Sequence, residues 1–142
     1  MLVAQILKNK GSQVFRCAPS DSLTAVAAML DEHRVGAIVV TEGEKVSGII
    51  SERDVVRAVC RHGASALERA VRDYMTSDVV FARPQESIDE LMERMTDRRI
   101  RHLPVCEADR LIGIVSIGDV VKAKIAETEH EAETLKAYIV SG

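Results

Sequence analysis

The sequence predicts an α+β fold made of two copies of one βαββα unit. Three observations support this prediction: a gapless internal repeat, apolar residues at helical spacing in each copy, and paired apolar runs on either side of a polar turn. The 142 residues suit one compact domain or two closely packed halves. Because 46% of the residues are hydrophobic but only 3% are aromatic and none is Trp, the core must be aliphatic.

The repeat becomes visible when Pro19 is aligned with Pro84, which places residues 14–56 on residues 79–121 without a gap. A chance match of this length would not also preserve Gly, Pro, Ser and Asp, so we infer an internal duplication. The residues that coincide include Ser22/Ser87, Arg34/Arg99, Val40/Val105, Glu42/Glu107, Gly48/Gly113, Ile49/Ile114, Ser51/Ser116 and Asp54/Asp119.

Each copy predicts the same order of elements. Ser22 and Ser87 can cap a helix, because their hydroxyl groups accept hydrogen bonds from its free backbone N–H groups, and apolar residues then recur at i, i+3, i+4 and i+7. The paired apolar runs that follow predict a β-hairpin, which leads into a second helix. We expect strands at 14–17, 37–40 and 46–50, and at 79–82, 103–105 and 111–115, with helices at 23–32 and from residues 51, 88 and 116.

The repeat also divides the chain into segments. Residues 5–62 form the first repeat, 63–77 a connecting segment, 78–125 the second repeat and 126–142 a C-terminal extension. The extension is rich in Glu and Ala, which favours a helix running from Ile117 toward Tyr138. Because this helix continues past the repeat, we expect it to be available to a partner or a second subunit.

Composition and cysteine usage argue against several classes of protein. The formal net charge of −3 disfavours nucleic acid as a partner. No apolar run reaches the ~20 residues of a membrane span, and the N-terminus lacks a signal-peptide pattern, so we expect a cytoplasmic protein. Cys17, Cys60 and Cys106 form no C-x-x-C motif, which favours mostly buried thiols over disulfides or a zinc site.

We find no catalytic constellation. The four histidines are scattered, and neither a G-x-S-x-G turn nor a glycine-rich phosphate loop occurs. His102 and Cys106 would share one face of a strand, but two ligands without a third are weak support for zinc. We therefore expect neither an enzyme nor a metal site.

The most informative motif is Gly48–Asp54, which is repeated as Gly113–Asp119. Each motif is a strand that enters a helix, whose free N–H groups and dipole favour an anion. The Ser at the helix start can bind a phosphate, the Asp one turn further can accept from a ribose diol, and Arg53 adds a cation. Ser-x-x-Asp can also be a capping box with no ligand, but its occurrence in both copies favours a site.

Two weaker signals surround this motif. The basic cluster Arg98–His102 is either a solvated helix end or a phosphate clamp before a strand. Lys10 and Gly11 could bring a cation and a flexible backbone to a ligand, or could lie in a surface loop.

The duplicated unit, the G-h-x-S-x-x-D motifs and the strand Arg101–Val105 together resemble a tandem pair of cystathionine-β-synthase (CBS) domains, also called a Bateman module, over about residues 5–125. The chain resembles the small stand-alone bacterial type. The resemblance implies two copies packed through their sheets about a pseudo-two-fold axis, with two clefts between them. It also implies a homodimer in which four CBS units form a flat disc.

The resemblance further implies that each cleft can hold AMP, ADP, ATP, NAD(H) or S-adenosylmethionine. The motif Asp binds the ribose hydroxyls, the Ser and the residue before the Asp face the phosphates, and the first strand contacts the base. The expected ligand-binding residues are Lys10, Gly11, Val14, Ser51, Arg53, Asp54, Thr76, Val79, Arg101, His102, Pro104, Ser116, Gly118 and Asp119.

The two copies predict non-equivalent sites. Gly118 stands where the first copy has Arg53, which argues against strong phosphate binding by the second motif. Conversely, Arg101 and His102 stand where the first copy has the uncharged pair Gly36 and Ala37.

The leading hypothesis is therefore a regulatory module that senses energy or redox state through an adenine nucleotide and passes occupancy to an unidentified target protein. The alternative is a nucleotide-independent scaffold, in which Ser51 and Asp54 act only as helix caps. A nucleic-acid binder is disfavoured by the acidic charge and the scarcity of aromatic residues.

Overall fold

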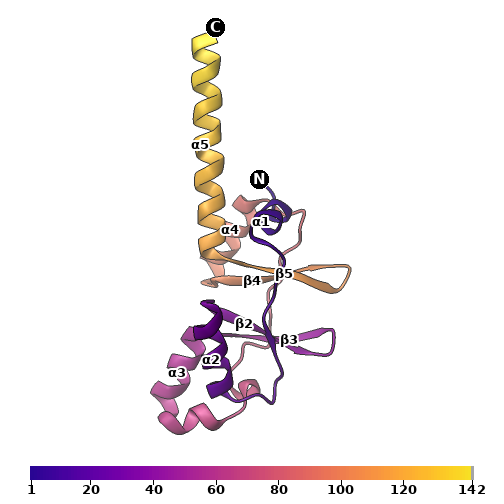
Figure 1. Ribbon diagram of the computed structural model, residues 1–142, viewed down its shortest axis with the longest axis vertical. Coiled ribbons are helices and arrows are strands. Elements are labelled where there is room, and N and C mark those ends of the chain that lie inside the picture. The colour runs from indigo at the N-terminus through magenta and orange to yellow at the C-terminus, as the bar shows by residue number, and fades with distance from the viewer. Residues whose placement is uncertain (142) are drawn as a thin grey trace.

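The computed structural model describes residues 1–141, and two α+β units are stacked along its long axis (Figure 1), which confirms the predicted fold class. The first unit contains β1 (Arg16–Cys17), α2 (Leu23–His33), β2 (Ala37–Glu42), β3 (Lys45–Ser51) and α3 (Glu52–His62). The second contains α4 (Ile88–Arg98), β4 (His102–Glu107), β5 (Arg110–Ser116) and α5 (Ile117–Ser141). The helix α1 (Val3–Lys10) and the short 3₁₀ helices η1 (Ala64–Glu68) and η2 (Val71–Asp73) lie outside these series.

The two hairpins have the same register, as expected of a duplication. Strands β2 and β3 are antiparallel with Val40 opposite Gly48, and β4 and β5 are antiparallel with Val105 opposite Gly113. In both hairpins the register shifts directly after that valine. The hairpin strands predicted from the sequence are thus confirmed, each one or more residues longer than expected.

The first strand of the second copy is a correction, because residues 79–82 form no strand. Only Ala82 forms an isolated parallel bridge, to Val105. In the first unit the N–H of Val39 donates to the carbonyl of Phe15 at 3.2 Å. Pro104 occupies the position equivalent to Val39 and has no N–H to donate, so the matching bond cannot form. The first copy does have its strand, although β1 is shorter than the predicted 14–17.

The hydrophobic core of each unit includes residues from the segment that, in the sequence, comes directly before the other unit. The core of the first unit contains Ala66 and Val71 from the stretch that leads into the second unit. The core of the second unit contains Val3, Ile6 and Leu7 from α1, which leads into the first unit. The two units are therefore interlocked through their entering segments, an arrangement that the internal repeat alone did not predict.

The motif glycines make room for these entering segments. A Cβ added at Gly48 would lie 2.6 Å from Sδ of Met75, and one added at Gly113 would lie 2.6 Å from Cδ2 of Leu7. Both distances are far below van der Waals contact, so any larger residue would force the side chain of Met75 or Leu7 to move. The repeated glycine therefore has a packing role beside its place in the motif.

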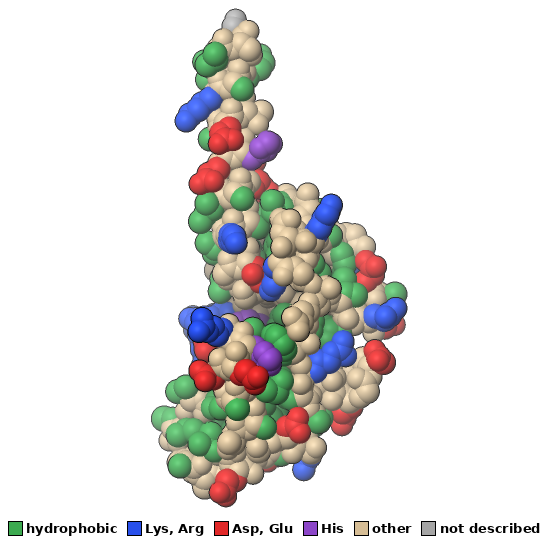
Figure 2. All heavy atoms as spheres, in the orientation of Figure 1, with side chains coloured by type: hydrophobic (Ala, Val, Ile, Leu, Met, Phe, Trp, Pro, Cys, Tyr) green, Lys and Arg blue, Asp and Glu red, His purple; other side chains and the backbone are tan. Residues whose placement is uncertain are grey.

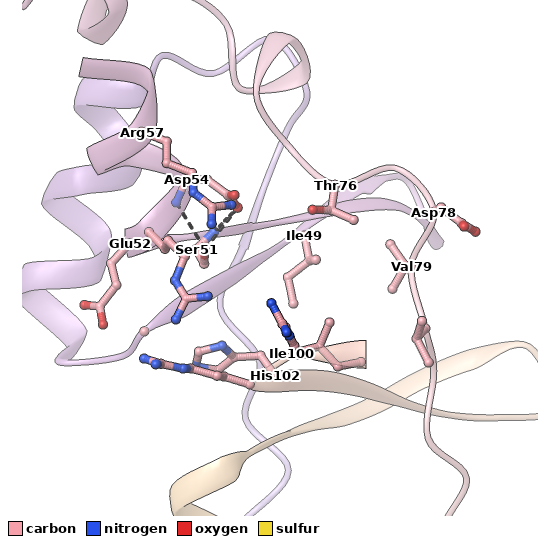
Figure 3. A pocket seen from close by; sticks show the side chains of 15 residues that line it. Ile49, Ser51, Glu52, Asp54, Arg57, Thr76, Asp78, Val79, Ile100 and His102 are labelled. Atoms are coloured by element: carbon pink, nitrogen blue, oxygen red, sulfur yellow. Dashed lines mark hydrogen bonds between the residues drawn. The ribbon is translucent and has the colours of Figure 1, made fainter. Parts of the chain in front are cut away.

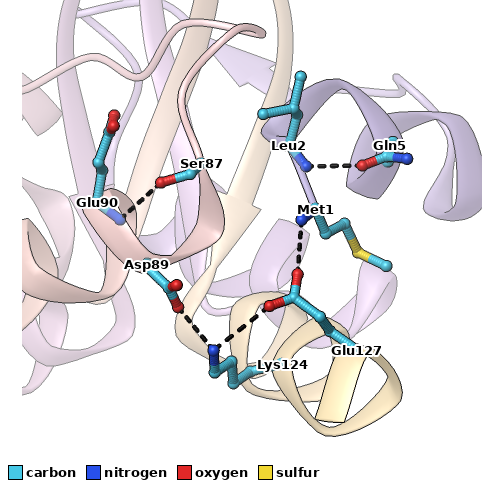
Figure 4. A network of polar contacts seen from close by, with 8 residues as sticks. All are labelled: Met1, Leu2, Gln5, Ser87, Asp89, Glu90, Lys124 and Glu127. Atoms are coloured by element: carbon cyan, nitrogen blue, oxygen red, sulfur yellow. Dashed lines mark hydrogen bonds and ion pairs between the residues drawn. The ribbon is translucent and has the colours of Figure 1, made fainter. Parts of the chain in front are cut away.

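Only the first part of α5 packs against the body of the protein, through the buried residues Val120 and Ala123. The N-terminal ammonium group binds Glu127 at 2.6 Å, and Lys124 lies between Glu127 and Asp89 (Figure 4). The rest of the helix extends beyond the body, ending at Ser141 rather than near Tyr138 as expected (Figure 1). None of the described helices combines the length and the apolar character needed to cross a membrane.

The cysteines differ from one another. Cys17 is buried, and burial raises the pKa of its thiol to about 11. Cys106 is half-buried, whereas Cys60 is exposed on α3. The expectation of mostly buried thiols is therefore wrong for Cys60.

Candidate functional site

The first motif forms a complete capping box at the start of α3. The hydroxyl of Ser51 accepts from the N–H of Asp54 at 3.2 Å, and Oδ2 of Asp54 accepts from the N–H of Ser51 at 2.9 Å and from its hydroxyl at 3.0 Å. Ser51 and Asp54 therefore do cap the helix. The cap leaves one oxygen of Asp54 unused, because its Oδ1 has no hydrogen bond to residues 1–141.

The second motif has the same box and one additional bond. Oδ2 of Asp119 accepts from the N–H of Ser116 at 2.9 Å and also from Nζ of Lys10 at 2.6 Å. The ammonium group of Lys10 donates to the carbonyl of Ile114 as well, at 3.0 Å. Burial acts to raise the pKa of Asp119, but the hydrogen bonds from Lys10 and Ser116 outweigh it and hold the pKa below its usual value. This carboxylate is therefore already paired.

A cleft of about 260 Å³ lies beside the first motif, at the junction of the two units (Figure 3). Its size is close to the lower end, about 300 Å³, of typical small-molecule sites. The first unit contributes the start of α3 and the end of β3, while the second contributes the residues between α4 and β4. The lining residues are Gly36, Ile49, Ser51, Glu52, Arg53, Asp54, Arg57, Thr76, Asp78, Val79, Val80, Arg99, Ile100, Arg101 and His102.

Two elements bring positive charge into this cleft. Arg53 and Arg57 stand one turn apart on α3. Arg99 ends α4 in the left-handed conformation, with φ of 54°, and the chain then turns into Arg101 at the start of β4. Figure 2 shows Lys and Arg side chains gathered where the two units meet.

These four guanidinium groups form no ion pair within the described part of the chain, although Glu52, Asp54 and Asp78 also line the cleft. Guanidinium groups bind phosphate oxygens in pairs of parallel hydrogen bonds. The N-terminus of α3 adds its dipole at the same place. The cleft is therefore suited to an anionic ligand.

His102 lies against the first unit from the opposite wall. A Cβ added at Gly36 would lie 2.8 Å from its Nε2, so the imidazole packs directly on that glycine. Burial lowers the pKa of His102 below its usual value, an effect that the charge of Glu52 opposes. A negative charge brought close to the imidazole would favour its protonated form.

The structure brings half of the predicted ligand-binding residues into one cleft. They are Ser51, Arg53, Asp54, Thr76, Val79, Arg101 and His102. Of the other seven, Lys10, Ser116 and Asp119 are joined around the second motif, and Pro104 is buried in β4. The remaining three, Gly11, Val14 and Gly118, do not line the cleft described here.

Sequence reasoning missed several lining residues. Arg57 could have been found, because it follows Arg53 by four residues and so lies on the same helix face. Arg99 belongs to the basic cluster whose phosphate-clamp interpretation was left open, and its position in the cleft favours that interpretation. Asp78 and Ile100 carry no signal in the sequence, since only the stacking of the two units places them there.

Comparison with known proteins identifies the family to which this chain belongs. A family model for the CBS domain matches residues 4–61 and residues 71–126. The chain therefore belongs to the CBS domain family and contains a tandem pair of CBS domains.

Proteins similar to this chain include one from a plant and two from bacteria. The mitochondrial CBS domain-containing protein CBSX3 of Arabidopsis thaliana is 36% identical over 99% of this chain and 72% of its own length. The CBS-domain protein ATU1752 of Agrobacterium tumefaciens is 45% identical, with a TM-score of 0.86 over 87% of this chain and 99% of that one. A CBS-domain protein of Burkholderia ambifaria is 39% identical, with a TM-score of 0.85 over 89% and 95% of the two chains.

Some CBS-pair structures of the same fold contain adenosine-based ligands. The CBS domain protein PAE2072 of Pyrobaculum aerophilum is complexed with AMP, at 24% identity and a TM-score of 0.75 over 84% of this chain and 89% of that one. The CBS domain pair of MJ0100 is complexed with 5′-methylthioadenosine and S-adenosylmethionine, at 23% identity and a TM-score of 0.79 over 89% and 98%. At these identities the likeness to this chain is one of fold.

Proposed function

We propose that this protein is a non-catalytic regulatory module that binds an adenosine-containing nucleotide in the cleft between its two CBS units. The observation that carries the proposal is that a hydrogen-bond acceptor in one unit and cationic groups in the other line the same cleft. A free carboxylate oxygen of Asp54 lies in one unit, and the unpaired guanidinium groups of Arg99 and Arg101 lie in the other. A ribose diol and a phosphate in one molecule would use both.

Each part of the nucleotide has suitable partners. Oδ1 of Asp54 accepts from the ribose hydroxyls while Oδ2 keeps the helix cap. The phosphates lie at the start of α3, near Ser51, Arg53 and Arg101. The adenine ring lies along the apolar side of the cleft, which is formed by Ile49, Val79, Val80 and Ile100. AMP, ADP, ATP, NAD(H) and S-adenosylmethionine all contain the ribose and adenine that this arrangement recognises.

The first cleft is the stronger of two non-equivalent sites. Around the second motif Lys10 already binds Oδ2 of Asp119 at 2.6 Å, so this carboxylate presents less uncompensated charge to a ligand than Asp54 does. The first motif has no such competitor among residues 1–141. A module with one strong cleft lined by both units reports occupancy by favouring one arrangement of the units over another, provided that the nucleotide binds the two arrangements with different affinity.

The test is calorimetry and thermal unfolding with AMP, ADP, ATP, NAD, NADH and S-adenosylmethionine on the wild type, Asp54→Ala and Asp119→Ala. Both variants lose the capping carboxylate of their motif, and Asp119→Ala also loses the ion pair with Lys10, so the thermal shift of each variant is compared with its own ligand-free protein. A nucleotide at 100 times its Kd stabilises the fold by about 2.7 kcal/mol. We expect at least one nucleotide to do so and Asp54→Ala alone to abolish the effect.

A second matched pair tests the phosphate contact. Arg99 and Arg34 both end a helix in the left-handed conformation, but only Arg99 lines the cleft. We expect Arg99→Gly to weaken binding at least tenfold and Arg34→Gly to leave it unchanged. If the proteins are folded but none of the nucleotides binds, the proposal is wrong and the scaffold alternative holds.

A further inference from the structure

An apolar stripe runs along α5 without a partner in the described chain. Its members follow one another at alternating steps of four and three residues, the a and d spacing of a coiled coil. Four of them have large apolar side chains, and their exposed fractions rise from 43% at Val121 and 54% at Ile125 to 60% at Leu135 and 67% at Ile139. The full stripe is Val121, Ile125, Thr128, Ala132, Leu135 and Ile139.

The stripe does not face the body of the protein. Where α5 packs, the buried residues are Val120 and Ala123, and Lys124 and Glu127 bind the neighbouring segments (Figure 4). At 100° per residue these four point about 110° away from the stripe. The stripe therefore continues unobstructed from the body to the tip of the helix, and Figure 2 shows hydrophobic side chains among those of the projecting helix.

The charges beside the stripe distinguish between possible partners. In the heptad numbering Lys124 and Glu131 take g positions, while Glu129 and Lys136 take e positions. In a parallel pair of identical helices each g residue faces the e residue of the next heptad on the other helix. Glu131 of one copy then faces Lys136 of the other, twice by symmetry.

The second such pair, Lys124 with Glu129, is also of opposite charge, although Lys124 is already bound to Asp89 at 2.9 Å. An antiparallel pair would instead bring Glu131 near Glu131 and Glu129 near Glu129. The charge pattern is thus complementary to a parallel second copy of the same helix.

We propose that the exposed half of α5 forms a parallel two-stranded coiled coil with a second copy of this chain. This association does not depend on bound nucleotide. It determines how the predicted homodimer is arranged, because α5 lies along the axis on which the two units are stacked (Figure 1). A two-fold axis parallel to α5 places each unit beside the same unit of the other copy.

The first unit offers a corresponding apolar surface on α3. Val56 of α3 is the repeat equivalent of Val121, and 67% of it is exposed. Val59 on the same helix is also exposed. A parallel arrangement lets α3 meet α3 while α5 meets α5, whereas an antiparallel arrangement would leave the two C-terminal helices projecting from opposite ends.

The experiment is sedimentation equilibrium on the full-length protein. Leu135→Glu/Ile139→Glu places charge in the stripe, and Ala137→Glu/Val140→Glu places the same charge on other faces of the same turns. We expect the wild type and the control to dimerise, and the stripe variant to dimerise at least tenfold more weakly. Circular dichroism and the nucleotide response should match among the three proteins, which separates this outcome from misfolding and from failure of the nucleotide proposal.

Orientation is tested by oxidation of Ile139→Cys in a Cys60→Ser background, because Cys60 is the exposed native thiol. In a parallel pair the two new thiols are adjacent and form a disulfide-linked dimer. In an antiparallel pair residue 139 lies opposite residue 121, about 27 Å from its counterpart. The proposal is overturned by a monomeric wild type, by equal dimerisation of the stripe and control variants, or by a dimer without this crosslink.

Discussion

His102 illustrates how a single residue can tie ligand binding to pH. In the free protein burial keeps the pKa of its imidazole below the usual value. At a pH above the usual histidine pKa, His102 is neutral in both the folded and the unfolded protein, and it costs the fold nothing. As the pH falls through that usual pKa, the unfolded chain takes up a proton before the folded protein does, so the folded protein loses stability. A phosphate in the cleft reverses this balance by attracting the imidazolium form.

We predict from this that nucleotide affinity rises as the pH falls from about 8 to about 6, since the complex takes up a proton that the free protein does not. The measurement is calorimetric titration of the wild type and His102→Gln at both pH values. The ionisation of the phosphate itself is common to the two proteins and cancels in the comparison. Equal pH dependence in both would show that His102 does not contact the bound anion.

At the scale of elements, strand β3 lies very close to the segment that enters the second unit. At Gly48 an added Cβ would lie 2.9 Å from the carbonyl oxygen of Thr76, besides its clash with Met75. That carbonyl accepts the N–H of Ile49 at 3.0 Å, so it is held in place. At Gly113 the contact is with the flexible end of Leu7 alone.

We therefore predict that Gly48→Ala lowers the free energy of unfolding by about 1–3 kcal/mol, in the range of overpacked cores, and that Gly113→Ala lowers it less. Urea denaturation followed by circular dichroism gives both values. If both variants lose the same free energy of unfolding, the backbone neighbour of Gly48 moves aside as easily as the side-chain neighbour of Gly113. Gly48→Ala should also weaken nucleotide binding, because Thr76 lines the cleft.

At the scale of the whole molecule, the exchange of entering segments makes the two units depend on each other. Leu7 belongs to the core of the second unit, although it precedes the first in the sequence, and Val71 belongs to the core of the first. Unfolding the first unit alone would leave a long unstructured loop between α1 and the rest of the second core, and closing such a loop costs conformational entropy.

We predict that the protein unfolds in one transition and that Leu7→Ala and Val71→Ala both lower its single midpoint, each by the equivalent of about 2–4 kcal/mol, with Leu7→Ala the larger. Differential scanning calorimetry tests this, with equality of calorimetric and van't Hoff enthalpies as the criterion. Two resolved transitions, with each variant shifting only one, would show instead that the units fold independently.

The sequence by itself determined the duplication, the fold class, the hairpins and the position of both Ser-x-x-Asp motifs. These features follow from local periodicity, capping chemistry and the repeat, all of which act between residues close in the chain. It also identified seven of the residues that line the cleft. Ser51, Arg53 and Asp54 came from the motif at the helix start and Arg101 and His102 from the basic cluster, whereas Thr76 and Val79 came from the resemblance to CBS domain pairs.

The tertiary structure decided what depends on packing between distant segments. The helix α1 lacks a repeat partner and gains its place only by completing the second core. The missing strand at residues 79–82 follows from Pro104, a residue on another strand. Likewise, Lys10 meets Asp119 because α1 packs on the second unit, and Arg99 and Asp54 line one cleft because the units are stacked. A local sequence pattern cannot predict these contacts, because they form between segments that are far apart in the chain.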